Sequence, residues 1–274
     1  MGKFDKILIC TDLDGTLFRN DKTISSKNIK AIEYFKSEGG FFTFVTGRMP
    51  LFSSHVAEII KPNAPFGCIN GAGLFDVNKN DYIWTKSLSD GYKELIKEID
   101  EKFQNVGIQV NTFYKAYFCK DNKSMERFRK LTGAEHLVRN YNNFNEPIAK
   151  VLFGSEYDEE ILEIEKTLKA HPVACNFDFI RSEKNLYEIL PKDTGKGTTI
   201  KKLCEHLNID RNNTIAIGDY NNDISMLKEA KIGIAVSNAC DDVIKAADYI
   251  TVSNEESAIA KVIEDLDNNI LKII

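Results

Sequence analysis

Two aspartates, Asp12 and Asp14, follow directly after a short apolar run, and their position suggests chemistry. The run Ile7–Cys10 is typical of a strand that is buried on both faces, so the aspartates stand at its C-terminal end. Burying two carboxylates is costly unless a cation or hydrogen bonds compensate. Ligands of open α/β sheets bind at the carboxyl ends of the strands. The segment therefore indicates an active site, although Asp and Gly also favour surface turns.

A calcium-binding loop is excluded for the same segment. Such a loop requires glycine at its sixth position and glutamate at its twelfth. Counted from Asp12, these positions hold Leu17 and Thr23.

Three further segments combine a predicted strand or helix start with polar side chains. They are Phe41–Arg48, which ends in Thr46, Gly47 and Arg48; Thr194–Thr198, which carries Lys196; and Thr214–Asp223, which ends in Asp219, Asn222 and Asp223. Each has an ordinary structural alternative when taken alone. Thr46 could cap a helix, Lys196 could be a solvated helix residue, and Arg48 could form a structural salt bridge.

All four segments together resemble the motifs of the haloacid dehalogenase-type phosphatase superfamily. In this sequence the motifs are Asp12-x-Asp14-Gly-Thr-Leu, Thr46-Gly-Arg, Lys196-Gly and Gly218-Asp219-x-x-Asn222-Asp223, in the family's order and spanning most of the chain. The resemblance implies an α/β fold with a Rossmann-like parallel sheet core. It also implies a Mg²⁺-dependent hydrolase that acts on phosphoric monoesters.

The resemblance further implies a role for each motif residue. Asp12 would be the nucleophile that forms an aspartyl phosphate, and Asp14 the general acid and then the general base. Mg²⁺ prefers oxygen ligands, and here they would come from Asp12, Asp219 and the backbone carbonyl of Asp14. Thr46, Gly47, Lys196 and Asn222 would bind the substrate phosphate. Asp223 would lie just outside the direct metal ligands or hold Lys196, and Arg48 would either contact the phosphate or substrate or form a structural salt bridge.

Composition agrees with an ordinary cytoplasmic enzyme. The chain has 274 residues, 43% of them hydrophobic, and a formal net charge of −5, so it carries no global basic field for nucleic acid. No apolar run approaches the roughly 18 residues of a membrane span, and we expect no signal peptide. The six cysteines lie far apart without a Cys-x-x-Cys pair, which favours reduced thiols over a zinc site or a disulfide framework.

Strands and helices alternate at both ends of the chain, which predicts a parallel sheet with right-handed crossovers. The predicted strands are 7–11, 41–45, 66–69, 214–217, 232–236 and 249–251. The predicted helices are 26–38, about 50–60, 222–230, 239–246 and 255–266, and Ser25 or Ser26 would cap the first of them. Asp241 and Asp242 are predicted to cap the helix that begins near residue 239.

The middle of the chain predicts a separate, smaller α+β domain. Predicted strands at 113–119, 149–153 and 173–180 alternate with predicted helices at 89–103, 122–131 and 156–170. We therefore expect a core made of 1–82 and 187–274 with an insertion at 83–186, and hinges near 79–85 and 187–192. The insertion lies between Thr46 and Lys196, where it resembles the C2B cap of Cof-type phosphatases. Within it, Lys150 and Arg181 would either contact a substrate or lie on a solvated surface.

Two glycine-rich segments mimic nucleotide-binding motifs. Gly71-Ala-Gly73 follows a predicted strand but lacks the third glycine of a dinucleotide fingerprint. Gly195–Thr199 resembles a phosphate loop, yet Gly197 stands where that loop needs a hydroxyl residue.

The sequence thus predicts a Mg²⁺-dependent phosphatase for small phosphorylated metabolites, such as sugar, pyridoxal or flavin phosphates. We expect no nucleic-acid or membrane partner, and no oligomeric state is predicted. Two alternatives remain. One is a phosphomutase on the same core. The other is a non-catalytic phosphometabolite-binding protein, which would be expected to lack Asp12 or Lys196.

Overall fold

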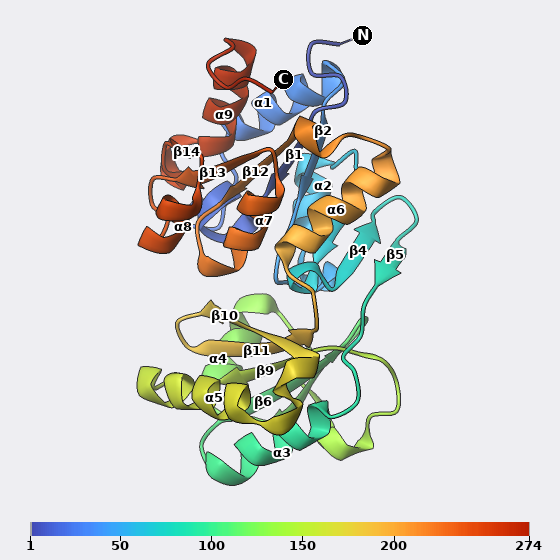
Figure 1. Cartoon of the computed structure of the whole chain (residues 1–274), viewed down its shortest axis with the longest axis vertical. Coiled ribbons are helices and arrows are strands. Elements are labelled where there is room, and N and C mark those ends of the chain that lie inside the picture. The colour runs from blue at the N-terminus through green and yellow to red at the C-terminus, as the bar shows by residue number, and fades with distance from the viewer. Residues whose placement is uncertain (1, 274) are drawn as a thin grey trace. The chain divides into compact units, whose positions relative to one another are not determined.

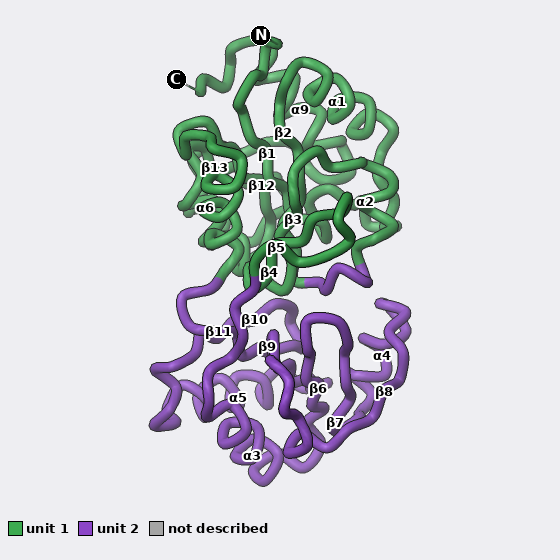
Figure 2. Tube along the Cα trace, turned by 90° about the vertical axis from the view of Figure 1, so that its right-hand side faces the viewer, with its two compact units in different colours: residues 1–47, 53–84, 195–274 green, residues 48–52, 85–194 purple. Residues whose placement is uncertain are grey.

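The computed structural model describes residues 2–273, which form two compact units, and Figures 1 and 2 show their elements. Unit 1 comprises Met1–Gly47, Ser53–Trp84 and Gly195–Ile274. Unit 2 comprises Arg48–Phe52 and Thr85–Thr194. The predicted boundary at 82/83 lies two residues before the observed division at 84/85, and the one at 186/187 lies eight residues before the division at 194/195. The prediction also placed Arg48–Phe52 in the core, whereas it belongs to unit 2.

Unit 1 is built on a five-stranded parallel sheet in the order β14-β13-β12-β1-β2 (Figure 1). Its strands are β1 (Leu8–Thr11), β2 (Phe41–Phe44), β12 (Thr214–Gly218), β13 (Ile232–Val236) and β14 (Tyr249–Thr251). All residues of β1 and β12 are buried, as the unbroken apolar runs predict. From β1 the chain first adds β2 on one side and later β12 on the other. The strand order therefore reverses between β1 and β12, where doubly wound sheets bind ligands.

Helices cover both faces of this sheet. They are α1 (Ser26–Ser37), α2 (Ser54–Ile60), α6 (Lys196–Leu207), α7 (Ile224–Glu229), α8 (Asp241–Ala246) and α9 (Ala258–Asp267). The pair α1 and α9 packs together, as does the pair α6 and α7, and Figure 2 shows α1 and α6 on opposite sides of the sheet. A small sheet of β3 (Phe66–Cys68), β4 (Gly73–Asp76) and β5 (Asp81–Thr85) joins the edge of β2 through a parallel bridge between Val45 and Gly67.

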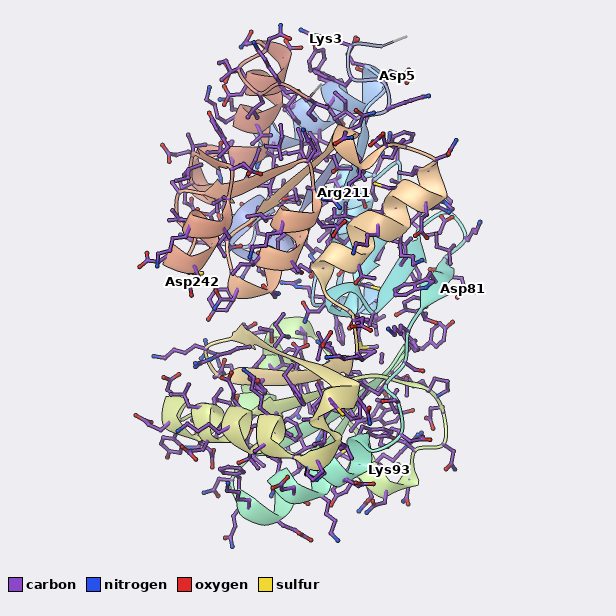
Figure 3. All side chains as sticks on the ribbon, viewed as in Figure 1. Lys3, Asp5, Asp81, Lys93, Arg211 and Asp242 are labelled. Carbon is purple, nitrogen blue, oxygen red and sulfur yellow. The ribbon has the colours of Figure 1, made fainter. Side chains whose placement is uncertain are left out.

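Local capping signals explain where two of these helices begin. The Ser25 side chain accepts a hydrogen bond from the Asn28 N–H and so caps α1, as predicted. The predicted cap of α8 is wrong, because Cys240 is the N-cap residue and Asp241 and Asp242 lie in the first turn; Figure 3 labels Asp242. Acidic residues in a first turn still stabilise a helix through its dipole.

Unit 2 contains a six-stranded sheet in the order β10-β11-β9-β6-β7-β8. Its strands are β6 (Gly107–Thr112), β7 (Ala116–Lys120), β8 (Leu137–Val138), β9 (Ile148–Gly154), β10 (Phe177–Glu183) and β11 (Leu186–Pro191). Neighbours are antiparallel except β7 and β8. The helices are α3 (Tyr92–Lys102), α4 (Lys123–Thr132) and α5 (Asp158–Ala170), and α3 and α5 bury one face of the sheet against residues such as Val110, Val151 and Ile189.

Two strand predictions in the middle of the chain need correction. The predicted strand 113–119 begins too early, because Phe113 lies in the turn between β6 and β7. The predicted strand 173–180 also begins too early, because Pro172–Asn176 forms a short 3₁₀ helix before β10. The strands β6, β8 and β11 were not predicted. The predicted hinge at 187–192 falls largely on β11, which pairs with both β9 and β10 and therefore belongs to unit 2.

Within residues 2–273, no helix has both the length and the apolar character needed to cross a lipid bilayer.

Candidate active site

The ends of β1 and β12 bring two aspartates of the predicted site together. The backbone N–H of Asp12 donates to the Ile217 carbonyl at 2.9 Å, which extends the pairing of the two strands by one residue. Asp219 follows two residues after Ile217 and therefore lies beside Asp12. Asp12 is only 6% exposed, so this carboxylate is held in a nearly water-free position.

The chain after Asp12 makes one wide turn, Leu13–Leu17, that closes with the Phe18 N–H donating to the Leu13 carbonyl at 2.8 Å. The turn returns the Thr16 hydroxyl to the site, where it donates to Asp219 Oδ1 at 2.7 Å. On the far side of the turn, Asn238 Nδ2 donates to the Gly15 carbonyl at 2.8 Å.

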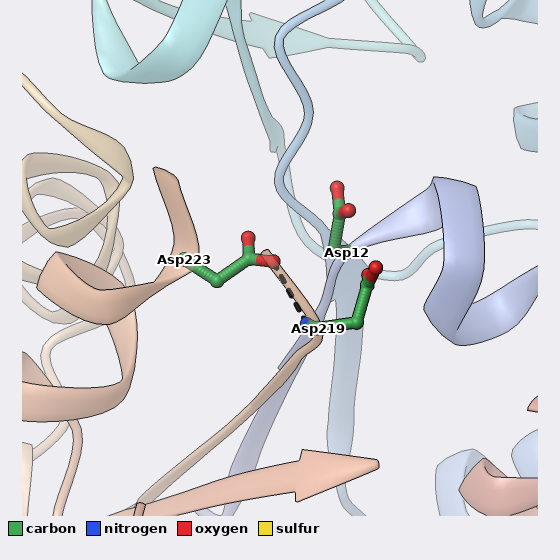
Figure 4. A group of neighbouring side chains, drawn as sticks. All are labelled: Asp12, Asp219 and Asp223. Carbon is green, nitrogen blue, oxygen red and sulfur yellow. Dashed lines mark hydrogen bonds between the residues drawn. The ribbon is translucent and has the colours of Figure 1, made fainter. Parts of the chain in front are cut away.

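Asp223 completes an acidic group with Asp12 and Asp219 (Figure 4). The three residues each offer an oxygen atom within 4.8 Å of the others. Asp223 Oδ2 accepts hydrogen bonds from the backbone N–H groups of Asp219, at 2.9 Å, and Tyr220, at 3.0 Å. Figure 4 shows this bond to Asp219 and the carboxylates of Asp12 and Asp219 side by side.

Lys196, at the start of α6, places its ammonium group among these acids. Its Nζ lies 2.6 Å from Asp12 Oδ1 and 2.5 Å from Asp223 Oδ1. The side chain is 1% exposed, so the alternative of a solvated helix residue is wrong. One buried cation thus faces three carboxylates, which leaves an excess of negative charge when all are ionised.

The pKa values follow from this charge balance. Burial raises the pKa of Asp12 well above its ordinary value, and the Asp223 charge adds to this effect against the opposing effect of Lys196. Burial, and then the Asp223 charge, raise the pKa of Asp219 to about 7. Burial lowers the pKa of Lys196, but the charges of Asp12 and Asp223 outweigh it and hold this pKa above its ordinary value.

The acidic group fits a hard divalent cation such as Mg²⁺. Within residues 2–273, Asp12 Oδ2 and Asp219 Oδ2 accept no hydrogen bond from a protein group, whereas both oxygens of Asp223 do. Carboxylate oxygens are the ligands that Mg²⁺ prefers. Asp12 and Asp219 therefore each offer an oxygen to a cation, which would also offset the excess negative charge.

Asp14 is not one of the three acids of this group, although its charge adds slightly to the raised pKa of Asp219. Its carboxylate is 40% exposed and lies 2.9 Å from Lys22 Nζ. A partly exposed carboxylate can exchange protons with water, which a general acid or base must do.

Thr46 and Gly47 follow β2, and Thr46 is 2% exposed. Thr46 does not cap a helix, because the next helix, α2, has Ser53 as its N-cap residue. The predicted Asn222 is also buried, and its amide donates to Asn70 at 3.1 Å. Asn70 was not predicted as a site residue. Arg48 belongs to unit 2, where its guanidinium contacts the Phe52 carbonyl at 3.5 Å.

The two basic residues singled out in the predicted insertion are also not freely solvated. Lys150 on β9 is buried and lies 2.9 Å from Glu188 on β11, so the expectation of a solvated surface is wrong for this residue. Arg181 is partly buried and bonds to Asp158 and to the Lys184 carbonyl.

The fold and the acidic site define a parallel α/β core with a buried acidic group and a second unit, and comparison with known proteins identifies the class of protein. A family model for haloacid dehalogenase-like hydrolases matches residues 9–263. The chain therefore belongs to the haloacid dehalogenase-like hydrolase family, and within it to the Cof-type phosphatases. This confirms the predicted superfamily, fold class and hydrolase activity.

Individual relatives agree over nearly the whole chain. The chain is 27% identical over 264 residues to the 5-amino-6-(5-phospho-D-ribitylamino)uracil phosphatase YitU of Bacillus subtilis, covering 94% of this chain and 96% of the relative. It is 29% identical over 256 residues to the B. subtilis phosphatase YcsE, which has the same enzyme name, covering 93% and 94%. These relatives differ from this chain at most positions.

Solved structures show the same fold. A haloacid dehalogenase-like hydrolase from Bacteroides thetaiotaomicron superposes with a TM-score of 0.81 at 26% identity, covering 96% of this chain and 100% of that one. A sugar phosphatase of haloacid dehalogenase subclass IIB superposes with a TM-score of 0.83 at 23% identity, covering 95% and 99%.

Proposed function

We propose that this phosphatase is a cytoplasmic, Mg²⁺-dependent phosphomonoesterase that hydrolyses small phosphorylated metabolites through an aspartyl phosphate on Asp12. The observation that carries the proposal is the placement of Asp12. It is a buried carboxylate at the end of β1, paired with one lysine and lying beside a second carboxylate, Asp219. A carboxylate that can act as a nucleophile, an ammonium group and a carboxylate that can bind a metal ion together suit the transfer of a phosphoryl group.

Asp12 would attack the phosphorus atom with one carboxylate oxygen, and the bond from phosphorus to the ester oxygen would break. Asp14 would donate its proton to the departing oxygen, which leaves as an alcohol. The same carboxylate, now ionised, would take a proton from water as the water attacks the aspartyl phosphate and releases inorganic phosphate. Splitting one displacement into two steps is the usual benefit of a carboxylate nucleophile. The solvent contact of Asp14 supports its two proton transfers.

Mg²⁺ would be held by the carboxylates of Asp12 and Asp219 and, by family resemblance, the Asp14 carbonyl, and would supply positive charge where two anions must meet. Asp223 would stay outside the direct ligands, because its oxygens are bonded to Lys196 and to two backbone N–H groups. In that position it would orient Lys196.

Lys196 would share its ammonium group between Asp12 and a phosphate oxygen. Thr46, Gly47 and Asn222 would donate to the other phosphate oxygens. These groups would neutralise and orient the phosphoryl group, on which most of the catalysis of phosphoryl transfer depends.

We further infer that unit 2 is a cap of the C2B type and that it selects the organic part of the substrate. Its place in the chain supports this inference, since almost all of it is inserted between Gly47 and Lys196, two residues of the proposed site. Unit 2 consists of one mostly antiparallel sheet and three α-helices, which agrees with the predicted α+β insertion.

The test is phosphate release from a panel of phosphorylated metabolites with Mg²⁺. The panel should contain sugar phosphates, pyridoxal and flavin phosphates, and the phosphorylated ribitylaminouracil after which two relatives are named. We expect release from at least one compound, loss of activity with EDTA, and no activity in Asp12→Asn. Full activity of Asp12→Asn would contradict the covalent mechanism. Isomerisation of a sugar phosphate in place of phosphate release would favour a phosphomutase.

A further inference from the structure

The loop Ile69–Gly71, between β3 and β4, has an uncommon backbone conformation. The φ angles of its three residues are +54°, +50° and +90°. Positive φ is unfavourable for a β-branched residue such as Ile69 and indicates strain there, whereas asparagine adopts this region more readily. Ile69 and Asn70 are both fully buried, so the surrounding structure enforces this conformation.

The loop is tied to the end of β2, where the Thr46 motif lies. The Thr46 N–H donates to the Gly67 carbonyl at 2.9 Å, and the Asn70 N–H donates to the Thr46 carbonyl at 3.1 Å. The Asn70 side chain also lies against Gly47, where an added Cβ atom would be 2.9 Å from Asn70 Oδ1. Thr46 and Gly47 are therefore positioned partly by this loop.

The loop also contacts the segment that carries Lys196. Gly71 packs so closely that an added Cβ atom would lie 1.9 Å from the Gly195 carbonyl oxygen. Only glycine fits there, and its φ angle of +90° also favours glycine. This close contact explains why position 71 is a glycine without any role in dinucleotide binding.

A third contact joins the loop to the motif at 218–223. Asn222 Nδ2 donates to Asn70 Oδ1 at 3.1 Å, and both side chains are buried. One strained loop thus meets the segments of Thr46, Lys196 and Asn222, which are distant in the sequence.

We propose that Asn70 is a positioning residue for phosphate binding, and that it acts by fixing the amide of Asn222 and the backbone at Gly47. This inference rests on the proposed phosphatase function. Both glycine and asparagine tolerate the left-handed conformation of Asn70. The conformation alone therefore does not require the contacts that the side-chain amide makes, and these contacts are with two residues of the proposed phosphate site.

The test is the substitution Asn70→Gly, which removes the amide and keeps the backbone conformation accessible. We expect kcat/KM for p-nitrophenyl phosphate to fall about tenfold, the change that corresponds to one lost hydrogen bond. The inhibition constant of inorganic phosphate should rise by a similar factor. The matched control is Asn80→Gly, an exposed residue with a φ angle of +51° in the β4–β5 turn, and it should leave both constants unchanged.

A double-mutant cycle separates positioning from a general structural effect. If Asn70 acts through Asn222, then Asn70→Gly should add little to the loss already caused by Asn222→Ala. Fully additive losses, or an unchanged phosphate inhibition constant in a folded Asn70→Gly protein, would overturn the inference. A wild-type protein without any phosphatase activity would instead contradict the proposed function, so the two failures are distinguishable.

Discussion

Lys196 and Asp12 form a buried ion pair, with Lys196 Nζ 2.6 Å from Asp12 Oδ1. The same ammonium group lies 2.5 Å from Asp223 Oδ1, so it bridges the first and the last of the motifs. A buried ammonium between two carboxylates stays protonated, and the raised pKa of Lys196, which these two charges cause in spite of burial, agrees with this. Lys196 therefore acts as a fixed positive charge and not as a base.

The first prediction is that Lys196→Met abolishes phosphatase activity and lowers the free energy of unfolding of the metal-free protein. The substitution leaves Asp12, Asp219 and Asp223 together without a cation, and an uncompensated buried charge costs about 3–5 kcal/mol. We expect kcat to fall at least about a thousandfold, because a fixed positive charge that stabilises the transition state of phosphoryl transfer contributes a factor of this size. The checks are steady-state kinetics and denaturant unfolding with EDTA.

Lys201→Met is the matched control for this substitution. Lys201 lies on the same helix, α6, but its side chain is 59% exposed and pairs with Glu229 on the surface. Such a pair contributes about 0–1 kcal/mol, so activity and stability should change little. Equal effects of the two substitutions would contradict the central role of Lys196.

A second prediction concerns the leaving group. If Asp14 protonates the departing oxygen, Asp14→Asn should reduce kcat/KM for an alkyl phosphate by about 10²–10⁴-fold. The loss should be much smaller for p-nitrophenyl phosphate, whose phenolate leaves without a proton. The comparison variant is Lys22→Met, which removes the ammonium group 2.9 Å from Asp14 Oδ1 but keeps the Asp14 carboxylate. Equal losses on both substrates in Asp14→Asn would assign Asp14 a structural role.

The core sheet could be predicted from sequence because its strands are continuous apolar runs followed by distinctive polar residues. β1 and β12 are of this kind, and Asp12 and Asp219 follow directly from where these strands end. β6 alternates apolar residues with polar ones such as Gln109, a pattern that favours a strand with one exposed face, yet both of its faces are buried. β11 does not alternate: it carries the charged Glu188 among apolar residues and ends at Pro191, and both residues weaken the signal of a buried strand.

The supporting contacts of the site could not be predicted for a different reason. Thr16 bonds to Asp219, and Asn70 bonds to Asn222, across more than 150 positions of the chain. Such pairs depend on tertiary structure alone. An Asn-Gly dipeptide after a predicted strand was the one local signal for Asn70, and it is typical of ordinary turns as well.

A third prediction links pH, metal and stability. In the metal-free fold, burial and Asp223 raise the pKa of Asp219 to about 7. Between the ordinary pKa of an aspartate, about 3.9, and 7, the folded state then binds more protons than the unfolded state. The contribution of Asp219 to stability is therefore lost as the pH rises through this range.

Mg²⁺ would replace those protons, so its stabilising effect should increase with pH. We expect the gain in Tm from saturating Mg²⁺ to be greater at pH 8 than at pH 5.5 by at least about 3 °C, roughly the shift for 1 kcal/mol in a protein of this size. Thermal unfolding with Mg²⁺ or EDTA at both pH values measures this difference. Asp219→Asn should remove most of it, and an equal gain at both pH values would argue against metal binding by these carboxylates.

The last prediction concerns the buried pair of Lys150 and Glu188 in unit 2. Their side chains are 5% and 3% exposed, and they join β9 to β11 at 2.9 Å. Lys150→Met would leave the Glu188 carboxylate without this ammonium group, and we expect a loss of about 3–5 kcal/mol in the free energy of unfolding. Lys130→Met removes an exposed lysine paired with Glu126 on α4 and should cost less than about 1 kcal/mol.

The double variant Lys150→Met/Glu188→Leu tests whether the loss comes from the buried Glu188 charge once the Lys150 ammonium group is gone. Replacing both members of a buried pair by apolar residues of similar volume is often neutral or stabilising, so most of the lost stability should return. Denaturant unfolding of the wild type, Lys150→Met, Glu188→Leu and the double variant gives the coupling energy between the two residues. Stability equal to wild type in Lys150→Met alone would show that Glu188 is compensated by other groups and that this ion pair does not stabilise unit 2.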